Sequence, residues 1–242
     1  YRSLQRQSIS DFEWLVINDG STDQTDDLLE TWLLEENKFP IRYYKQENRG
    51  LMASFNTAIE LAEGEYLAKI DSDDYVSDDY AESIFKWLKT IKDNKEVYAV
   101  GGMRGNEDGV PIKGPACWPL VDKNTGYLDI YDYERGQYNL DADMSEAWSV
   151  SVLREYRFPV FPGERYAPEE IVFNAIALAG HKVRWFPHII CTCEYQSDGI
   201  TKNDVLIQKN NPLGFSMMWK NKLKFQVSLP RKVFCLCQAQ AL

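Results

Sequence analysis

The chain has 242 residues, of which 44% are hydrophobic, 13% aromatic and 26% charged, so it can bury a core and is not expected to be disordered. Its formal net charge of −10 argues against a nucleic-acid-binding surface. The five cysteines form no C-x-x-C repeat, which is typical of a reduced cytosolic setting rather than of a zinc framework or a disulfide scaffold, and no stretch approaches the ~20 apolar residues of a membrane span.

The first hundred residues alternate between predicted strands and helices. Residues 1–7 have the pattern of a helix already under way, so we expect the start of the domain to be missing. Apolar, β-prone runs predict strands over residues 12–18, 41–45 and 66–70. Helices are predicted between them over residues 23–36 and 51–62. The inner face of the first helix is expected to carry Leu28, Leu29, Trp32 and Leu33. This order predicts βαβ units, an α/β fold and a mostly parallel sheet flanked by helices.

A polar turn follows each of the first three predicted strands. These turns span residues 19–22, 48–50 and 71–74. Ligands of parallel sheets bind beyond the carboxyl ends of the strands, so we expect the turns to converge on one crevice. The chain contains neither a G-x-G-x-x-G nor a Walker-type run, and dinucleotide binding and P-loop chemistry are therefore not supported.

The third turn holds three carboxylates within four residues, Asp71, Asp73 and Asp74. Carboxylates this close repel one another unless a cation or a set of donors compensates. Oxygen ligands on a loop suit Mn²⁺ or Mg²⁺, which proteins commonly hold through one or two carboxylates and the phosphates of a substrate. The alternative is a solvated acidic turn ahead of the next helix.

The second half of the chain is less regular. A helix is predicted over 78–94, a strand over 97–103, and a loop-rich segment with the character of a lid or binding loop over 107–138. Later elements are a short helix entered at 147–150, a turn region at 158–165, a helix over 168–179, and strands over 182–187 and 189–195. Pro168 followed by Glu169 and Glu170 is also an ordinary helix start, because acids complement the N-terminal helix dipole.

The ordered motifs resemble the family 2 inverting glycosyltransferases of the GT-A fold. They are Val-Ile-Asn-Asp-Gly-Ser-Thr-Asp at 16–23, Glu-Asn-Arg-Gly at 47–50, Gly-Glu-Tyr at 64–66 leading into Ile-Asp-Ser-Asp-Asp at 70–74, and Pro-Glu-Glu at 168–170. The resemblance covers nearly the whole chain.

The resemblance implies roles for the acidic residues in nucleotide and metal binding. Asp19 would contact the nucleotide base, Arg49 the nucleotide, and Asp71 its ribose or base side. Asp73, the second acid of the D-x-D motif, would bind the metal, and Asp74 would support the turn.

The resemblance also places an acidic general base at the start of a late helix. Either Glu169 or Glu170 could be that base, and the distance to Gly180, which ends the helix, ranks Glu169 first. The metal would neutralise charge on the departing nucleoside diphosphate while the base takes a proton from an acceptor hydroxyl, which gives a single inversion. Trp148 could stack on an acceptor sugar, and the alternative is a core position.

Two features depart from the family pattern. The family begins with a strand that forms one wall of the nucleotide pocket, and this sequence starts after it, so a gap in the sheet is expected. Relatives often carry a metal-approaching histidine near residues 194–196, where this chain has Gln196, so no histidine ligand is expected.

The resemblance implies transfer of a sugar, UDP-linked by family frequency, to a hydroxyl acceptor in cell-surface polysaccharide or glycolipid synthesis. A sugar-nucleotide pyrophosphorylase and a non-catalytic nucleotide-sugar binding module are the alternatives.

The expected domain spans residues 1–200, with a nucleotide-binding half over 1–103 and an acceptor-binding half over 104–200. A basic helical tail follows over 201–242, with seven Lys or Arg against the single acid Asp204. Its aromatic and methionine residues could lie on an anionic membrane or near a lipid-linked acceptor, or the tail could pack on the domain. These features predict a cytoplasmic protein, peripheral at the inner face of the membrane.

Overall fold

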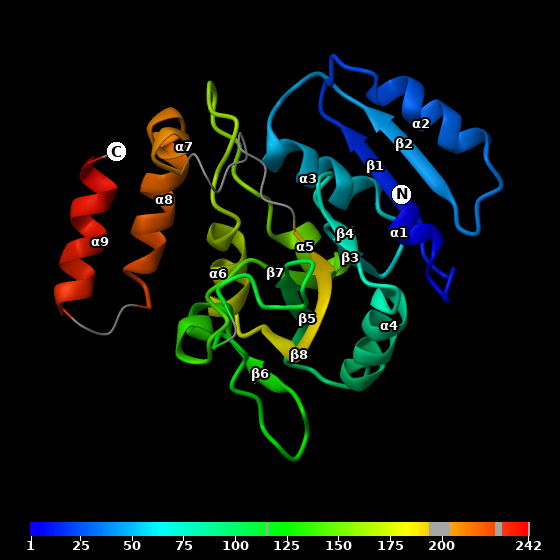
Figure 1. Cartoon of the computed structure of the whole chain (residues 1–242). Helices are drawn as coiled ribbons and strands as arrows, with labels where there is room; N and C mark the ends of the chain where they lie inside the picture. Colours follow the sequence, from blue (N-terminus) through cyan, green and yellow to red (C-terminus); the bar gives the residue numbers. More distant parts are fainter. Residues whose placement is uncertain (115, 194–203, 226–228, 242) are drawn as a thin grey trace.

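The computed structural model describes residues 1–114, 116–193, 204–225 and 229–241, and within them the strands form two sheets (Figure 1). The smaller sheet pairs β1 (Trp14–Asn18) with β2 (Ile41–Lys45). The larger has six strands, ordered β3 (Tyr66–Ala68), β7 (Met144–Ser149), β5 (Val97–Gly105), β8 (Lys182–Thr192) and β4 (Tyr75–Val76), with β6 (Leu128–Ile130) also paired to β8.

The sheets are mixed rather than mostly parallel. Among the described strands, β1–β2 and β5–β8 pair in parallel, whereas β3–β7, β5–β7, β4–β8 and β6–β8 are antiparallel. The antiparallel partners β4, β6 and β7 come from segments predicted as turn, loop and helix entrance. The prediction of helix entry at 147–150 was wrong by three residues, because Ala147 and Trp148 pair with β3 and β5 before α5 begins at Val150.

Helices cover the sheets and form the C-terminal part of the chain. They are α1 (Arg2–Gln5), α2 (Thr25–Leu34), α3 (Leu51–Leu61), α4 (Tyr80–Ile91), the 3₁₀ helix η1 (Asp132–Gln137), α5 (Val150–Glu155), α6 (Glu170–Leu178), α7 (Asp204–Asn210), α8 (Pro212–Lys222) and α9 (Leu229–Ala241). The predicted helices over 51–62, 78–94 and 168–179 are confirmed with small shifts at their ends. In α2 the predicted inner face was too wide, since Leu29 is buried but Leu28 and Leu33 are exposed.

The larger sheet is buried on both faces. Strand β5 contributes Ala99 and Met103 to one apolar cluster and Val97 and Val100 to the other. The first cluster packs under α3, α5 and α6, and the second under α4. Strand β5, with eight of its nine residues buried, is therefore covered on both sides. The predicted strands over 182–187 and 189–195 are one strand, β8, and residues 194 and 195 lie outside the described residues.

A gap separates the two sheets. Within the described residues β1 pairs only with β2, and β3 only with β7. Residues of both β1 and β3 line one large cavity of about 1820 Å³. The expected interruption of the sheet is therefore present, and it opens into this cavity.

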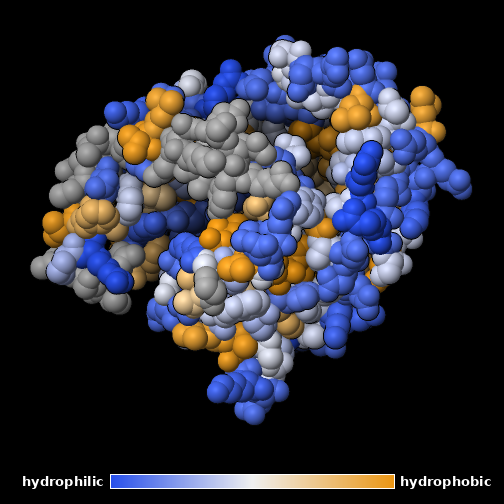
Figure 2. Space-filling view, in the orientation of Figure 1, coloured by the Kyte–Doolittle hydropathy of each residue, from blue (hydrophilic) through white to orange (hydrophobic). Residues whose placement is uncertain are grey.

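The C-terminal helices close another side of the same cavity. Trp219 and Lys222 of α8 and Phe234 of α9 line it, and Figure 2 shows the hollow between these helices and the rest of the molecule. Phe215 and Met218 of α8 are buried in the main apolar cluster. Helix α8 therefore packs on the domain, as the alternative reading of the tail predicted. None of the described helices combines the length and apolar character needed to cross a membrane.

Candidate active site

Five of the predicted site carboxylates line the same cavity. Asp19 follows β1, Asp71 and Asp73 follow β3, and Glu169 and Glu170 begin α6. The turns at 19–22 and 71–74 contribute residues to this cavity, whereas the turn at 48–50 contacts Asp19 but does not line the cavity itself. Trp148 and Arg49 do not line the cavity.

Lys69 connects the D-x-D loop to the start of α6. Its ammonium group donates a 2.6 Å hydrogen bond to Glu169 and lies 3.2 Å from Asp71. Burial alone would lower the pKa of Lys69, but the two carboxylates outweigh burial and raise it, so the side chain remains cationic. The two halves of the candidate site thus share one positive charge.

Arg104 of β5 is the second cation of the network. Its guanidinium donates to Asp71 at 3.0 Å, to Asp74 at 2.9 Å and to the carbonyl oxygen of Met144 at 2.9 Å. Burial tends to raise the pKa of Asp71, but Lys69 and Arg104 together hold that pKa below its ordinary value. Burial dominates at Asp74 and raises its pKa, because its side chain is only 6% exposed. That Asp74 supports the turn, as the resemblance implies, stays a prediction.

Asp73 differs from its neighbours because it is exposed and makes no hydrogen bond or ion pair with any described side chain. Its carboxylate faces the cavity with its oxygens available, whereas the charge of Asp71 is already offset by two cations. Hard divalent ions prefer such oxygen ligands together with substrate phosphates. The donor set at this loop therefore fits the ligand preference of Mn²⁺ or Mg²⁺.

Asp19 holds the turn that follows β2. It accepts hydrogen bonds from the backbone N–H groups of Arg49 at 2.9 Å and Gly50 at 2.7 Å, and from the side chain of Gln46 at 2.7 Å. Gly50 has φ +89°, and a Cβ at this position would lie 2.2 Å from the carbonyl oxygen of Arg165. Only glycine fits here, so Asp19 and Gly50 fix the loop, and the Arg49 side chain is left exposed.

Glu169 and Glu170 are paired with different lysines. Glu170 lies 2.7 Å from Lys222 of α8, and Glu169 bonds Lys69. Neither side chain caps the helix they begin. An ordinary helix start therefore explains why these two acids stand at this position in the chain. It does not explain why each of them is paired with a lysine.

A further carboxylate that the sequence analysis did not single out lines the cavity. Glu146 of β7 is 15% exposed, and Arg135 of η1 lies 3.8 Å from it. Burial raises the pKa of Glu146 to about 7, against the opposing effect of Arg135, and the nearby Asp132 raises it further. No motif marks this residue, since it lies in a stretch predicted to approach a helix.

Trp148 is a core residue. It is 2% exposed and its ring stacks on that of Phe173, with centroids 4.9 Å apart and planes 1° from parallel. Trp148 itself pairs with Leu67 of β3 and Ala99 of β5 in the middle of the sheet, and its buried ring is not available to a sugar. The prediction that Trp148 stacks on an acceptor sugar was therefore wrong, and its alternative, a core position, is what the structure shows.

Comparison with known proteins assigns the chain to a family. The sequence profile described as "Glycosyl transferase family 2" matches residues 1–148, more than half of the chain. The chain belongs to glycosyltransferase family 2. This member is 40% identical over 95 residues to the "Putative glycosyltransferase EpsH" of Bacillus subtilis (strain 168), a match that covers 39% of this chain and 26% of EpsH. It is 31% identical over 175 residues to the "Poly(ribitol-phosphate) beta-glucosyltransferase" of Bacillus spizizenii, which covers 71% of this chain and 26% of that protein.

Solved structures confirm the GT-A fold of this family 2 chain. S. aureus TarS 1-349 in complex with UDP matches with a TM-score of 0.59 at 16% identity, over 99% of this chain and 65% of that one. The mannosyltransferase PcManGT from Pyrobaculum calidifontis, in complex with GDP-Man and Mn²⁺, matches with a TM-score of 0.62 at 18% identity, over 99% of this chain and 68% of that one. The chain spans about a quarter of the length of the two sequence relatives named above.

Proposed function

We propose that the chain is a metal-dependent inverting glycosyltransferase that moves a sugar from a nucleotide-sugar donor, UDP-linked, to a hydroxyl acceptor. The observation that carries this proposal is that Asp71 and Asp73, which follow β3, line the same cavity as Glu169 and Glu170 at the start of α6. An inverting displacement at an anomeric carbon uses two acidic centres that flank the reacting carbon. The family assignment supports the reaction class.

Each residue has a proposed role on the donor side. Asp19 orders the turn that carries Arg49. Asp19 and Arg49 together border the nucleotide. Asp73, with Asp71 behind it, holds the divalent ion, which when bound neutralises charge on the departing diphosphate. Lys69 and Arg104 keep Asp71 ionised and fix the loop, so that Asp73 is presented to the cavity.

The base is proposed to be Glu169, with Glu170 as the second candidate. Glu169 shares Lys69 with Asp71 and therefore lies near the donor end of the cavity. It removes the proton from the acceptor hydroxyl as the oxygen attacks the anomeric carbon. Glu170 is held by Lys222 on the side closed by the C-terminal helices. The acceptor is proposed to enter on this side, through the half formed by residues 104–200.

The biological setting follows from relatives. One relative is described as a poly(ribitol-phosphate) glucosyltransferase, and this supports an acceptor in cell-surface polysaccharide or glycolipid synthesis. Exposed apolar residues on the outside of the tail support peripheral contact with the inner face of the membrane from the cytoplasm. They are Val205, Leu206, Leu213, Met217 and Val233.

A panel of nucleotide sugars with Mn²⁺ tests the proposal. Release of free nucleoside diphosphate from one of them, suppressed by EDTA, is the expected result. Formation of a nucleoside triphosphate that depends on pyrophosphate would instead indicate a sugar-nucleotide pyrophosphorylase. Binding without either product would indicate a non-catalytic module.

The two glutamates are then separated by variants. Glu169→Gln is expected to lower kcat by about 10²–10⁴-fold with donor binding retained, since a general base contributes roughly that factor. Glu170→Gln is expected to have the smaller effect. Glu60→Gln, an exposed surface ion-pair residue outside the cavity, is the matched control. A larger loss in Glu170→Gln would reassign the base.

A further inference from the structure

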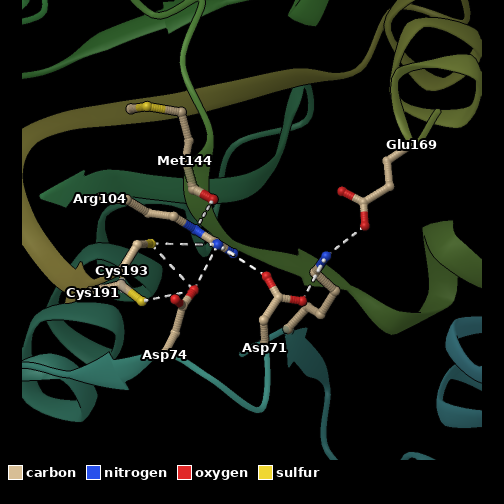
Figure 3. A network of polar contacts seen from close by, with 8 residues as sticks. Asp71, Asp74, Arg104, Met144, Glu169, Cys191 and Cys193 are labelled. Carbon is tan, nitrogen blue, oxygen red and sulfur yellow. Dashed lines mark hydrogen bonds and ion pairs between the residues drawn. The ribbon is translucent and has the colours of Figure 1, made fainter. Parts of the chain in front are cut away.

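Two thiols and a carboxylate meet beside the D-x-D loop. Figure 3 shows Cys191 and Cys193 of the β8 end facing Asp74. The Sγ atom of Cys193 lies 3.2 Å from Asp74 Oδ2, and that of Cys191 lies 4.0 Å from it. All three potential ligand atoms lie within 4.8 Å of one another. In the proposed transfer reaction neither thiol has a role.

Strand pairing fixes this arrangement. Asp74 immediately precedes β4, and Val76 of β4 pairs with Cys191 of β8. Cys191 also lies opposite Arg104 on β5. Because alternate residues of a strand point to the same face, Cys191 and Cys193 present both thiols to Asp74. The three side chains are thus set by the pairing of two strands, β4 and β8.

The spacing suits a tetrahedral metal centre. Ligand atoms about 2.0–2.3 Å from a zinc ion are roughly 3.3–3.8 Å apart in a tetrahedron. The two thiol–carboxylate separations, 3.2 and 4.0 Å, bracket this range. Cys191 is buried and Asp74 nearly so, which favours direct ligation over hydration.

Arg104 completes the charge balance. Two thiolates and one carboxylate carry three negative charges, and a divalent ion leaves one of them uncompensated. The guanidinium of Arg104 is 2.9 Å from Asp74 and 3.8 Å from Cys193, so it offsets the remaining charge. Hydrogen bonds from outer residues to metal-bound carboxylates are a common means of orienting the ligand.

We propose that Asp74, Cys191 and Cys193 form a binding site for a thiophilic divalent cation of the Zn²⁺ class, separate from the hard-ion position at Asp73. Soft thiolate ligands select Zn²⁺ over Mn²⁺ or Mg²⁺, whereas the exposed carboxylate of Asp73 has the opposite preference. Binding forms two metal–sulfur bonds and one metal–oxygen bond and releases the two thiol protons to solvent. The fourth position remains open to water.

The consequence is a clamp between the D-x-D loop and β8. An ion held by Asp74 from one side and by both cysteines from the other ties these segments together. Because the ion binds the folded arrangement, it is expected to raise Tm by about 5 °C or more at a hundredfold excess over its Kd.

Titration of the metal-free protein with Co²⁺, without nucleotide sugar, tests the site. The expected result is a near-ultraviolet thiolate-to-cobalt absorption band with one equivalent of Co²⁺, displaced by Zn²⁺ but not by Mg²⁺. Cys193→Ser and Cys191→Ala are expected to abolish the band, and Cys117→Ser, which alters a partly buried cysteine outside this cluster, to preserve it. Circular dichroism of the metal-free variants shows whether each is folded. If the variant at the buried Cys191 does not fold, the result for Cys193→Ser alone tests the site.

Two outcomes would overturn the proposal. One is the absence of a thiolate band in the parent protein, and the other is its persistence in folded Cys193→Ser. The measurement is independent of the proposed glycosyl transfer. Asp73→Asn is expected to retain the cobalt band even though it loses the hard-ion position, which separates the two metal sites.

Discussion

Lys69 donates a 2.6 Å hydrogen bond to Glu169, one hundred positions later in the chain. The same ammonium lies 3.2 Å from Asp71, so it stands between two carboxylates that would otherwise repel each other across the cavity. Substitution by methionine keeps the length and the apolar stem but removes this charge. We expect Lys69→Met to lower kcat/KM about 10–100-fold, corresponding to roughly 1.4–2.8 kcal/mol of transition-state stabilisation.

Metal affinity distinguishes a positioning role of Lys69 from general destabilisation of the protein. Without Lys69 the loop is more negative, so the Mn²⁺ concentration for half-maximal rate is expected to fall while kcat falls as well. Lys222→Met removes the corresponding partner of Glu170 and leaves Asp71 untouched, and it is the matched control. A Lys69→Met enzyme with parental kcat and parental Mn²⁺ dependence would exclude the positioning role.

Asp73→Asn tests the proposed hard-ion ligand. The amide keeps the size of the side chain but loses the charge, so the Mn²⁺ requirement should rise and the rate at limiting Mn²⁺ should fall about 100-fold or more, in line with a metal contribution of several kcal/mol. Initial rates across a Mn²⁺ series measure this. Asp78→Asn, an exposed residue paired with Arg6 outside the cavity, should be unaffected. Equal Mn²⁺ curves for Asp73→Asn and Asp78→Asn would remove Asp73 from the metal site.

The first half of the fold follows closely from sequence patterns. Apolar runs, polar turns and glycine stops are local signals, and they predict β1, β2 and α3 to within two residues at either end. Such local signals do not predict the antiparallel strands. Residues 75–76 and 128–130 are too short to show a period, and they become strands only by pairing with β8.

The residues of the candidate site also differ in how far the sequence predicts them. Asp19, Asp71, Asp73, Glu169 and Glu170 stand in recognisable motifs, and the structure places all of them on one cavity. Lys69, Arg104 and Glu146 stand in strands, where a charged residue gives no indication of the partner it meets. Arg104 is 33 residues from Asp71 and 40 from Met144, and only the sheet brings these groups together.

Trp148→Ala tests the core position of this residue. Truncation of a buried tryptophan leaves a cavity against Phe173 and is expected to lower the free energy of unfolding by about 3–5 kcal/mol. Denaturant titration measures the loss. Trp118→Ala, at an exposed tryptophan, is expected to stay within about 0.5 kcal/mol of the parent protein. A stability loss no greater than that of Trp118→Ala, accompanied by a raised KM for the acceptor, would return Trp148 to the acceptor site.

Glu146 makes stability depend on pH. Its pKa is raised from 4.5 in the unfolded chain to about 7 in the folded protein, so the folded state binds more protons between these two values. Stability from this group is therefore complete below about pH 4.5 and is lost as the pH rises through 7, by a total on the order of 3 kcal/mol. Glu146→Gln cannot ionise, and its Tm relative to the parent protein should climb across this window, whereas Glu60→Gln should track the parent protein. Tm profiles of Glu146→Gln and the parent protein that run parallel from pH 4.5 to 8 would show that burial does not hold Glu146 in its neutral form.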